Sequence, residues 1–443
     1  MRRAVLIFGL IFFFCLSVGT ARSQTLSVVR DEEIERTLLF YLTPLFEQAG
    51  LDTRNMAVHL VKDDSINAFA AKGLHVFVNT GLLTKADDGQ EVVAVLAHET
   101  GHIAGGHIVR MYENMQIARR SMLLSMILGS AAVAAGGGTD AAVGAVLGGV
   151  NSMQSVFAAY RRSEENAADQ TAVTLLEKTG HDFSGFAAIM RKLQSQEEWQ
   201  TTGGFELWRS HPAVRERLAL ILNRPAPART DTKRIAAENA LFDRIRAKLY
   251  GFLYPSKKTL ERYPATDTGL PARYARTIAA YRDGRFAEAM ADIDALIDDF
   301  PPDPYFYELK GQILFETGRA ADAVEPYRKA VELLPNSPLM RVGLIQSLTE
   351  RGDADGLAQA RKELAALPDT ADDLPLVWRL RAVVYGRSGR TEMADYALAE
   401  YNAATGNARQ AAFFARKALK RLPDGSAAAV RARDILENAD GEK

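Results

Sequence analysis

The apolar residues divide the chain into three stretches with different patterns. Residues 4–18 form one continuous apolar run. From residue 25 to residue 223, helical patterns alternate with short β-like runs such as Val76–Val78, which predicts a mixed α and β domain with a small sheet. From residue 271 to residue 438 the chain is rich in Ala and Leu at helical spacing, which predicts an all-α domain.

The first stretch is typical of an export signal. Two arginines precede the apolar run, and small residues follow it between Gly19 and Ser23, as expected before a signal-peptidase cleavage site. We therefore interpret residues 1–23 as a signal peptide, with an uncleaved membrane anchor as the alternative. Cys15 is the only cysteine and lies in this segment, so the rest of the chain can form neither disulfides nor Cys-based zinc sites.

The third stretch repeats. The segments GRFAEAMADIDALIDDFP and GRAADAVEPYRKAVELLP align with a period of 34, which places Ala289 over Ala323 and Pro301 over Pro335. This pattern resembles the tetratricopeptide repeat, in which small residues let paired helices pack closely and Pro ends the second helix. We expect a curved solenoid that binds peptides or proteins, and chance similarity among Ala-rich helices is the alternative. Residues 224–270 read as a linker that contains one helix, because a Pro-rich polar segment opens it.

Composition excludes several classes of protein. Lys plus Arg is 54 and Asp plus Glu is 55, so the net charge is −1, whereas a nucleic-acid-binding protein needs a basic surplus. With 47% hydrophobic and 25% charged residues, the chain is ordinary for a globular protein, which argues against disorder. Outside the N-terminus, no apolar stretch reaches the roughly 20 residues that a membrane-spanning helix needs.

The motif His98-Glu99-Thr100-Gly101-His102 carries the candidate chemistry. In a helix, residues four apart share a face, so His98 and His102 can both bind one zinc ion. Glu99 can reach a zinc-bound water and act as a general base. The surrounding segment is apolar nearly all round, which predicts a buried helix, and Gly101, Gly105 and Gly106 indicate close packing or a helix end. A pair of ordinary core histidines is the alternative.

A third ligand must come from farther along the chain. The metzincin pattern requires His at position 108, where this chain has Ile108. Glu165 and Asp169 are four residues apart on a predicted helix, so one can bind the metal while the other orients a ligand imidazole. We favour Glu165 as the ligand, and solvated surface acids are the alternative.

These motifs together resemble the gluzincin family of CAAX-prenyl-protease-like peptidases. The export signal and the repeats are similar to its periplasmic branch, the BepA-like proteases of Gram-negative bacteria. The resemblance implies one Zn²⁺ per chain, with Glu165 as the third ligand and Asp169 behind the ligands. It also implies that residues 67–83 include an edge strand beside the active cleft, to which an extended substrate could pair. An ordinary structural hairpin is the alternative.

Two further residues match a family element placed close to the metal. His211, followed by Pro212, is similar to a histidine thought to occupy the open zinc position and keep these enzymes latent. In the alternative role, His211 and Arg217 donate hydrogen bonds to the oxyanion that develops during catalysis. We therefore count Glu99, His211 and Arg217 as the candidate catalytic residues and His211 as a candidate fourth ligand.

The other histidines receive structural interpretations. His107 is expected to support the ligand shell rather than bind zinc, and His59, His75 and His181 have no partner pattern. Residues 121–150 form two short apolar arms around a Gly-rich break. They are interpreted either as a mobile helical hairpin that covers the cleft and touches the membrane surface, or as a buried hairpin that packs on the repeats.

The sequence thus predicts a periplasmic zinc endopeptidase. The resemblance implies that the repeats recruit unfolded or misassembled outer-membrane proteins, or the machinery that assembles them. The alternative is a periplasmic chaperone or assembly adaptor whose zinc site is latent. The presence of Glu99 favours catalysis, because a structural metal site needs no general base.

Overall fold

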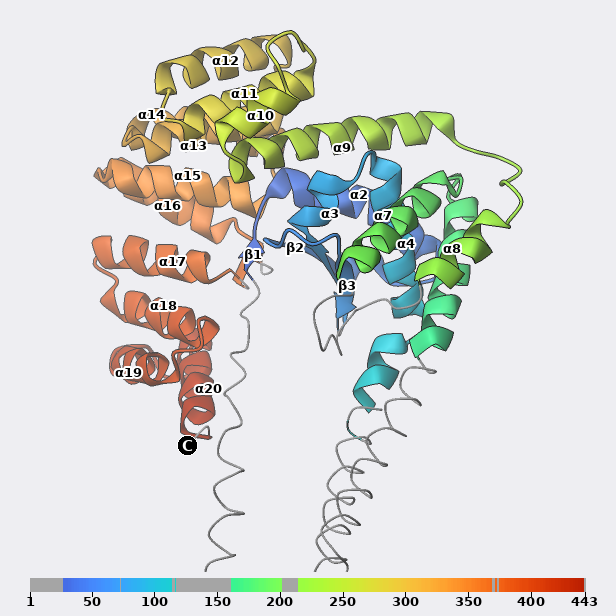
Figure 1. Ribbon diagram of the computed structural model, residues 1–443. Coiled ribbons are helices and arrows are strands. Elements are labelled where there is room, and N and C mark those ends of the chain that lie inside the picture. The colour runs from blue at the N-terminus through green and yellow to red at the C-terminus, as the bar shows by residue number, and fades with distance from the viewer. Residues whose placement is uncertain are drawn as a thin grey trace, which may run out of the picture.

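The computed structural model of the protein describes residues 27–71, 73–113, 116, 161–200, 214–368, 371–372 and 374–441. These residues form a small sheet surrounded by helices, followed by a long series of paired helices (Figure 1). The predicted fold class, a mostly helical protein with an α+β part and an all-α part, is confirmed. The predicted signal peptide at 1–23 and the apolar segment at 121–150 lie outside the described residues.

The sheet has four strands in the order β1-β2-β4-β3, with β3 at one edge. The strands are β1 (Val28–Val29), β2 (Met56–Val61), β3 (Ala68–Ala71) and β4 (Leu74–Asn79). β2 and β4 run parallel, whereas β1 and β3 are antiparallel to their neighbours. Alternation of side chains buries Val58, Leu60, Val76 and Val78 on one face of the sheet.

Helix α2 (Glu32–Gln48) packs against the sheet, and its residues share one core cluster with the buried strand residues. Asp31 caps its N-terminus by accepting a hydrogen bond from the Ile34 N–H group, 3.0 Å away. Leu38 and Leu42 are fully buried, and each contributes about 2 kcal/mol of hydrophobic stabilisation. The short helix α3 (Thr80–Lys85) follows β4 directly and leads into the central helix.

Helix α4 (Gly89–Ala104) is the central helix of this part, and it is buried along most of its length, as predicted. α7 (Ser184–Gln200) packs against it, and so does the helix over residues 161–178. At Gly101 a Cβ atom would lie 2.7 Å from the Ala168 carbonyl oxygen, so only glycine permits this approach. Gly106 has a φ of 65° just beyond the end of α4. The glycines therefore provide both the close packing and the helix end that were expected.

Helix α9 (Thr232–Leu253) connects the two parts of the molecule. Along its course it packs against α2, α3 and α4 and also against α11 (Leu270–Arg282), the first helix of the repeats (Figure 1). Arg244 forms ion pairs with Glu33 at the start of α2 and with Asp303, which precedes the repeat helix α13 (Pro304–Glu316). The Tyr274 hydroxyl donates to the Glu33 carboxylate over 3.0 Å. Buried polar contacts therefore hold the α+β part against the repeats.

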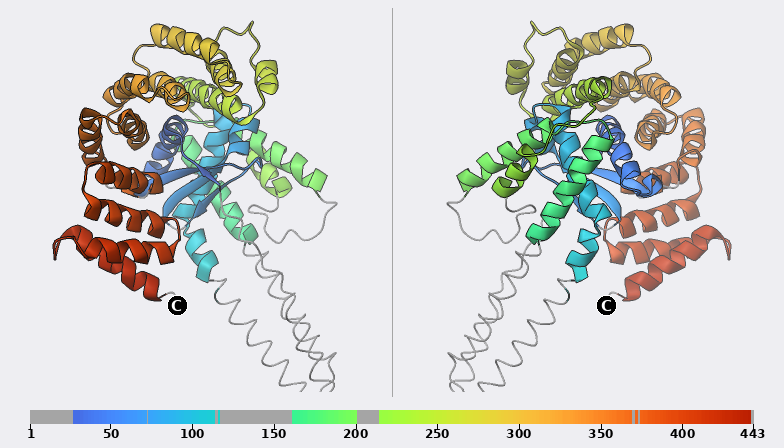
Figure 2. Two further views of the ribbon diagram at one scale, coloured as in Figure 1. Left: turned by 90° about the vertical axis from the view of Figure 1, so that its left-hand side faces the viewer. Right: turned by 90° about the vertical axis from the view of Figure 1, so that its right-hand side faces the viewer.

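The repeats are antiparallel helix pairs that follow one another in an arc, which is clearest in the side views (Figure 2). The aligned residues Ala289 and Ala323 are fully buried, as close packing of each pair requires. The short helix α10 (Ser256–Arg262) precedes the arc. The repeat helices are α11 (Leu270–Arg282), α12 (Phe286–Asp299), α13 (Pro304–Glu316), α14 (Ala320–Leu333), α15 (Pro338–Arg351), α16 (Ala354–Ala365), α17 (Pro375–Arg387), α18 (Thr391–Ala404), α19 (Ala408–Leu419) and α20 (Ala427–Gly441). No helix among the described residues is long and apolar enough to cross a membrane.

Candidate metal centre

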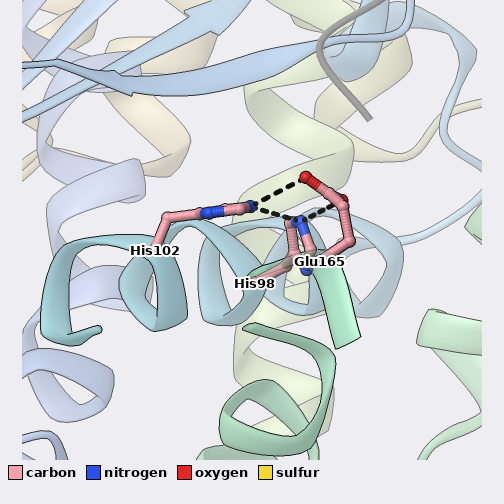
Figure 3. Close-up of side chains that lie close together, drawn as sticks. All are labelled: His98, His102 and Glu165. Carbon is pink, nitrogen blue, oxygen red and sulfur yellow. Dashed lines mark hydrogen bonds and ion pairs between the residues drawn. The ribbon is translucent and has the colours of Figure 1, made fainter. Parts of the chain in front are cut away.

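The two histidines of the central motif point in the same direction from α4. Their Nε2 atoms are 3.0 Å apart, and His98 is buried. This geometry follows from their spacing, because residues four apart on a helix lie one turn from each other. Figure 3 shows both rings turned toward Glu165 of the neighbouring helix.

Glu165 completes a compact set of three donors. Its Oε2 atom lies 3.3 Å from His98 Nε2, and its Oε1 atom lies 3.3 Å from His102 Nε2. Nitrogen and oxygen ligands at the usual zinc distances of about 2.0–2.1 Å, arranged as a tetrahedron, lie roughly 3.3–3.4 Å from one another. The two histidines and Glu165 therefore fit a zinc ion in both donor chemistry and spacing.

Asp169 lies behind the ligands and holds His98. Its Oδ1 atom is 2.8 Å from His98 Nδ1, the ring nitrogen on the side away from the donor set. This carboxylate–histidine contact fixes the orientation of the imidazole. Burial and Arg217 lower the pKa of His98, but its hydrogen bonds to Asp169 and Glu165 outweigh them and raise the pKa above its ordinary value.

Arg217 of α8 (Val214–Leu222) contacts both carboxylates and is almost fully buried. Its Nε and Nη2 atoms donate to the two Asp169 oxygens over 2.6 and 2.8 Å. Its Nη1 atom lies 2.8 Å from Glu165 Oε2. Burial alone would raise the pKa of Asp169, but the hydrogen bonds from Arg217 and His98 hold that pKa below its ordinary value. The structure thus places Arg217 against the carboxylates of Glu165 and Asp169.

His107, which begins the helix at 107–113, supports the second histidine ligand. Its Nδ1 atom lies 2.9 Å from His102 Nδ1. Burial, followed by the neighbouring His102, lowers the pKa of His107 to about 4. His107 is therefore neutral near pH 7 and can share a hydrogen bond with His102 without adding charge to the site, which agrees with its predicted supporting role.

Glu99 lies between the two histidines in the sequence and is nearly fully buried. Its Oε2 atom accepts a hydrogen bond from the Ala70 N–H group of the edge strand β3, over 2.9 Å. The candidate general base is therefore in contact with the strand that the family resemblance places beside the cleft. His211 lies outside the described residues, so its position relative to this centre is not described.

The remaining histidines make polar contacts away from the donor set. His59 Nε2 lies 2.8 Å from His75 Nδ1 on the half-buried face of the sheet. His181 Nε2 lies 2.8 Å from the carboxylate of Glu238 on α9. Glu238 also accepts hydrogen bonds from Gln90 of α4 and from Arg234, over 3.0 and 2.8 Å. Sequence reasoning did not identify Glu238, because nothing in its local pattern separates it from Asp243, the other acidic residue of this helix.

Both parts of the chain match known protein families. Residues 30–224 match Peptidase family M48. Residues 274–338 and residues 314–384 match two tetratricopeptide repeat families. The metal centre lies entirely within the first match, and the arc of paired helices contains the other two.

Curated relatives match much of the chain at low identity. The beta-barrel assembly-enhancing protease of Yersinia pestis is 24% identical over 389 residues, which cover 83% of this chain and 75% of that protein. The protein of the same name from Escherichia coli strain K12 is 24% identical over 303 residues, which cover 66% of this chain and 60% of that protein. Among solved structures, a thermophilic TPR protein of Thermus thermophilus matches with 20% identity and a TM-score of 0.24, covering 36% of this chain and 95% of that one. The chain is therefore a homologue of the beta-barrel assembly-enhancing proteases, with a peptidase domain of family M48 followed by tetratricopeptide repeats.

Proposed function

We propose that the protein is a zinc-dependent endopeptidase. The observation that carries this proposal is the buried triangle of His98, His102 and Glu165 donor atoms, with Glu99 on the same helix as the two histidines. A family M48 domain supports a metallopeptidase, and the donor set favours zinc among the divalent metals, because two imidazoles and one carboxylate are typical of catalytic zinc sites.

The residues of the chain have distinct roles in this proposal. His98, His102 and Glu165 would hold the zinc ion, which when bound polarises the scissile carbonyl and acidifies a water molecule. Glu99 would take the proton from the attacking water and pass it to the leaving amine. Asp169 would keep the His98 ring in the orientation that exposes Nε2 to the donor set.

For Arg217 the contacts favour a structural role over donation of a hydrogen bond to the oxyanion. Its guanidinium contacts Asp169 and Glu165, which supports a role in holding the two carboxylates in place. His211 remains the candidate for a fourth, inhibitory ligand. In that role it would fill the coordination position that the attacking water needs.

The proposed setting is the periplasm, and the proposed substrates are misfolded or misassembled envelope and outer-membrane proteins. The N-terminal segment supports export, and the name of the relatives concerns the assembly of β-barrels. The repeats would recruit these clients or their assembly machinery, since tethering raises the effective concentration of substrate at a weakly specific active site.

The first test compares degradation of an unfolded protein by the zinc-loaded chain with degradation by Glu99→Gln and His211→Ala variants. We expect Glu99→Gln to keep its zinc but lose cleavage, because glutamine cannot accept the proton from water. If His211 is an inhibitory ligand, His211→Ala should cleave at least as fast as the wild type.

Two other outcomes would contradict parts of this proposal. If all three proteins bind unfolded clients but none cleaves them, the protein is a chaperone or adaptor with a latent zinc site. If the wild type cleaves and His211→Ala does not, His211 acts in the transition state and the latency proposal is wrong.

A further inference from the structure

The contact between Glu99 and the edge strand β3 has a consequence for substrate binding. β3 pairs with β4 on one side only, and no other strand among the described residues adjoins its outer edge. An exposed strand edge is a template for an extended peptide, which binds by adding a strand to the sheet. Such a peptide needs the N–H and C=O groups of β3 that point outward.

The register of the sheet identifies these groups. The Asn79 N–H group donates to the Asn67 carbonyl over 3.0 Å, so these two residues form a hydrogen-bonded pair between the two strands. In an antiparallel ladder such pairs alternate with non-hydrogen-bonded ones. Residues 69 and 71 therefore face β4, whereas Ala68 and Ala70 direct their backbone groups to the outer edge.

The Ala70 N–H group is one of these outward donors, and Glu99 already uses it. A peptide that pairs with β3 alongside Ala70 needs the same hydrogen for its own carbonyl oxygen. One N–H group forms one strong linear hydrogen bond, so the carboxylate of Glu99 and the peptide carbonyl compete for it.

We infer that pairing of an extended substrate with β3 takes the Ala70 N–H group from Glu99 and so releases the carboxylate of the general base. This inference rests on the proposed peptidase function, in which Glu99 is the base. Before substrate binds, the hydrogen bond to β3 holds Glu99 in place. Once the substrate strand is paired, Oε2 of Glu99 is available to the attacking water and then to the leaving amine.

Binding to zinc-loaded variants that cannot cleave tests the competition directly. The probe is a fluorescein-labelled, uncharged twelve-residue peptide of Thr and Val, and fluorescence anisotropy gives its Kd. Glu99→Gln keeps an acceptor oxygen for the Ala70 N–H group, whereas Glu99→Leu has a similar size but no acceptor. We expect Glu99→Leu to bind the peptide about fivefold more tightly, which corresponds to one hydrogen bond.

Ala70→Pro identifies the group for which the two compete. Proline lacks the N–H group, and an edge strand tolerates it where that group points away from the ladder. In the Glu99→Leu background Ala70→Pro should remove the gain in affinity, and in the Glu99→Gln background it should change little, so that the two double variants bind alike. Circular dichroism and zinc content check that these variants are folded.

Two results would overturn the inference. One is equal affinity in Glu99→Leu and Glu99→Gln, and the other is a difference that persists after Ala70→Pro. If Ala70→Pro does not fold, Glu99→Ala replaces it: without an acceptor it must match Glu99→Leu, and a match with Glu99→Gln refutes the competition. All of these measurements use inactive variants, so they separate this inference from the peptidase function, which wild-type cleavage tests.

Discussion

At the scale of single residues, the carboxylate of Asp169 contacts two side chains of the candidate metal centre. One oxygen contacts the ring of His98, and both oxygens accept hydrogen bonds from Arg217. The spacing of four residues from Glu165 is a local property of a helix, so the sequence alone predicted that the two acids share a face. The partner Arg217 is 48 residues away in the chain, and no periodic pattern links the two positions.

Replacing Asp169 by Asn should weaken zinc binding. The amide keeps the size of the side chain but loses the charge that orients His98 and pairs with Arg217. We expect the affinity for zinc to fall about 10- to 100-fold, as is typical when a carboxylate behind a ligand histidine is removed. Competition with a chromophoric chelator measures the change.

Glu164→Gln is the matched control for this prediction. Glu164 lies on the same helix and is 3.4 Å from Arg110, and no described contact joins it to the ligand histidines. The substitution removes the same charge as Asp169→Asn. Because Glu164 does not orient a ligand histidine, zinc affinity should stay within about twofold of the wild type. An equal loss of affinity in both variants would mean that net charge, and not the orientation of His98, governs binding.

At the scale of elements, α9 ties together the helices that carry the metal ligands. Glu238 on α9 is fully buried and accepts hydrogen bonds from Gln90, near the start of α4. It also contacts His181, just after the helix that carries Glu165 and Asp169. The Glu238 carbonyl accepts a further hydrogen bond from the Tyr41 hydroxyl of α2 over 2.7 Å. One residue of α9 thus contacts three other segments of the peptidase part.

The stability that Glu238 provides should depend on pH. Burial would raise the pKa of Glu238, but the hydrogen bond and charge interaction with His181, together with hydrogen bonds from Arg234 and Gln90, hold that pKa below its ordinary value. A carboxyl with a lowered pKa in the folded state stabilises the protein above about pH 4.3 and loses that effect as the pH falls through the folded-state pKa. Glu238→Gln should therefore cost about 1–3 kcal/mol at pH 7, and the deficit should shrink below about pH 4.3.

Urea unfolding between pH 7 and pH 3.5 measures this dependence. Glu177→Gln serves as the control, because Glu177 is exposed on the helix over residues 161–178. That variant should match the wild type within about 0.5 kcal/mol at every pH. If the loss of unfolding free energy in Glu238→Gln does not change with pH, the charge of Glu238 does not cause that loss.

At the scale of the whole molecule, Arg244 joins the peptidase part to the repeats. Its guanidinium pairs with Glu33 and Asp303 and lies 4.6 Å from the centre of the Phe306 ring. Glu33 is 3% exposed, so the removal of Arg244 leaves a buried carboxylate with less compensation. The Lys248 Nζ atom lies 3.2 Å from the Glu33 carboxylate and would still compensate part of its negative charge.

Arg244→Ala should loosen this junction. We expect a loss of about 3 kcal/mol, the lower end of the range for a broken buried ion pair. In differential scanning calorimetry the peptidase part and the repeats should then unfold at more widely separated temperatures than in the wild type. Arg285→Ala removes an ion pair with Glu288 on the surface of α12 and should change stability by less than about 1 kcal/mol. Similar curves for both variants would argue against coupling through Arg244.

Much of the architecture could be predicted because it depends on local patterns. The helical spacing of His98 and His102 brings their rings together whatever surrounds them, and the period of 34 in the repeats requires similar helix pairs. The alternation along β2 and β4 likewise determines which side chains are buried. The sequence by itself thus determined the fold class and the helix pairs, and it placed two of the three proposed metal ligands side by side.

Only the tertiary structure decided which distant groups meet. Arg217 reaches the two carboxylates, Glu238 contacts Gln90 of α4 and His181, and the Ala70 N–H group contacts Glu99. These contacts join residues far apart in the chain, so their formation depends on how helices and strands pack and not on any spacing. The Ala70 contact also uses a backbone group, which every residue except proline carries, and so it leaves no mark in the sequence.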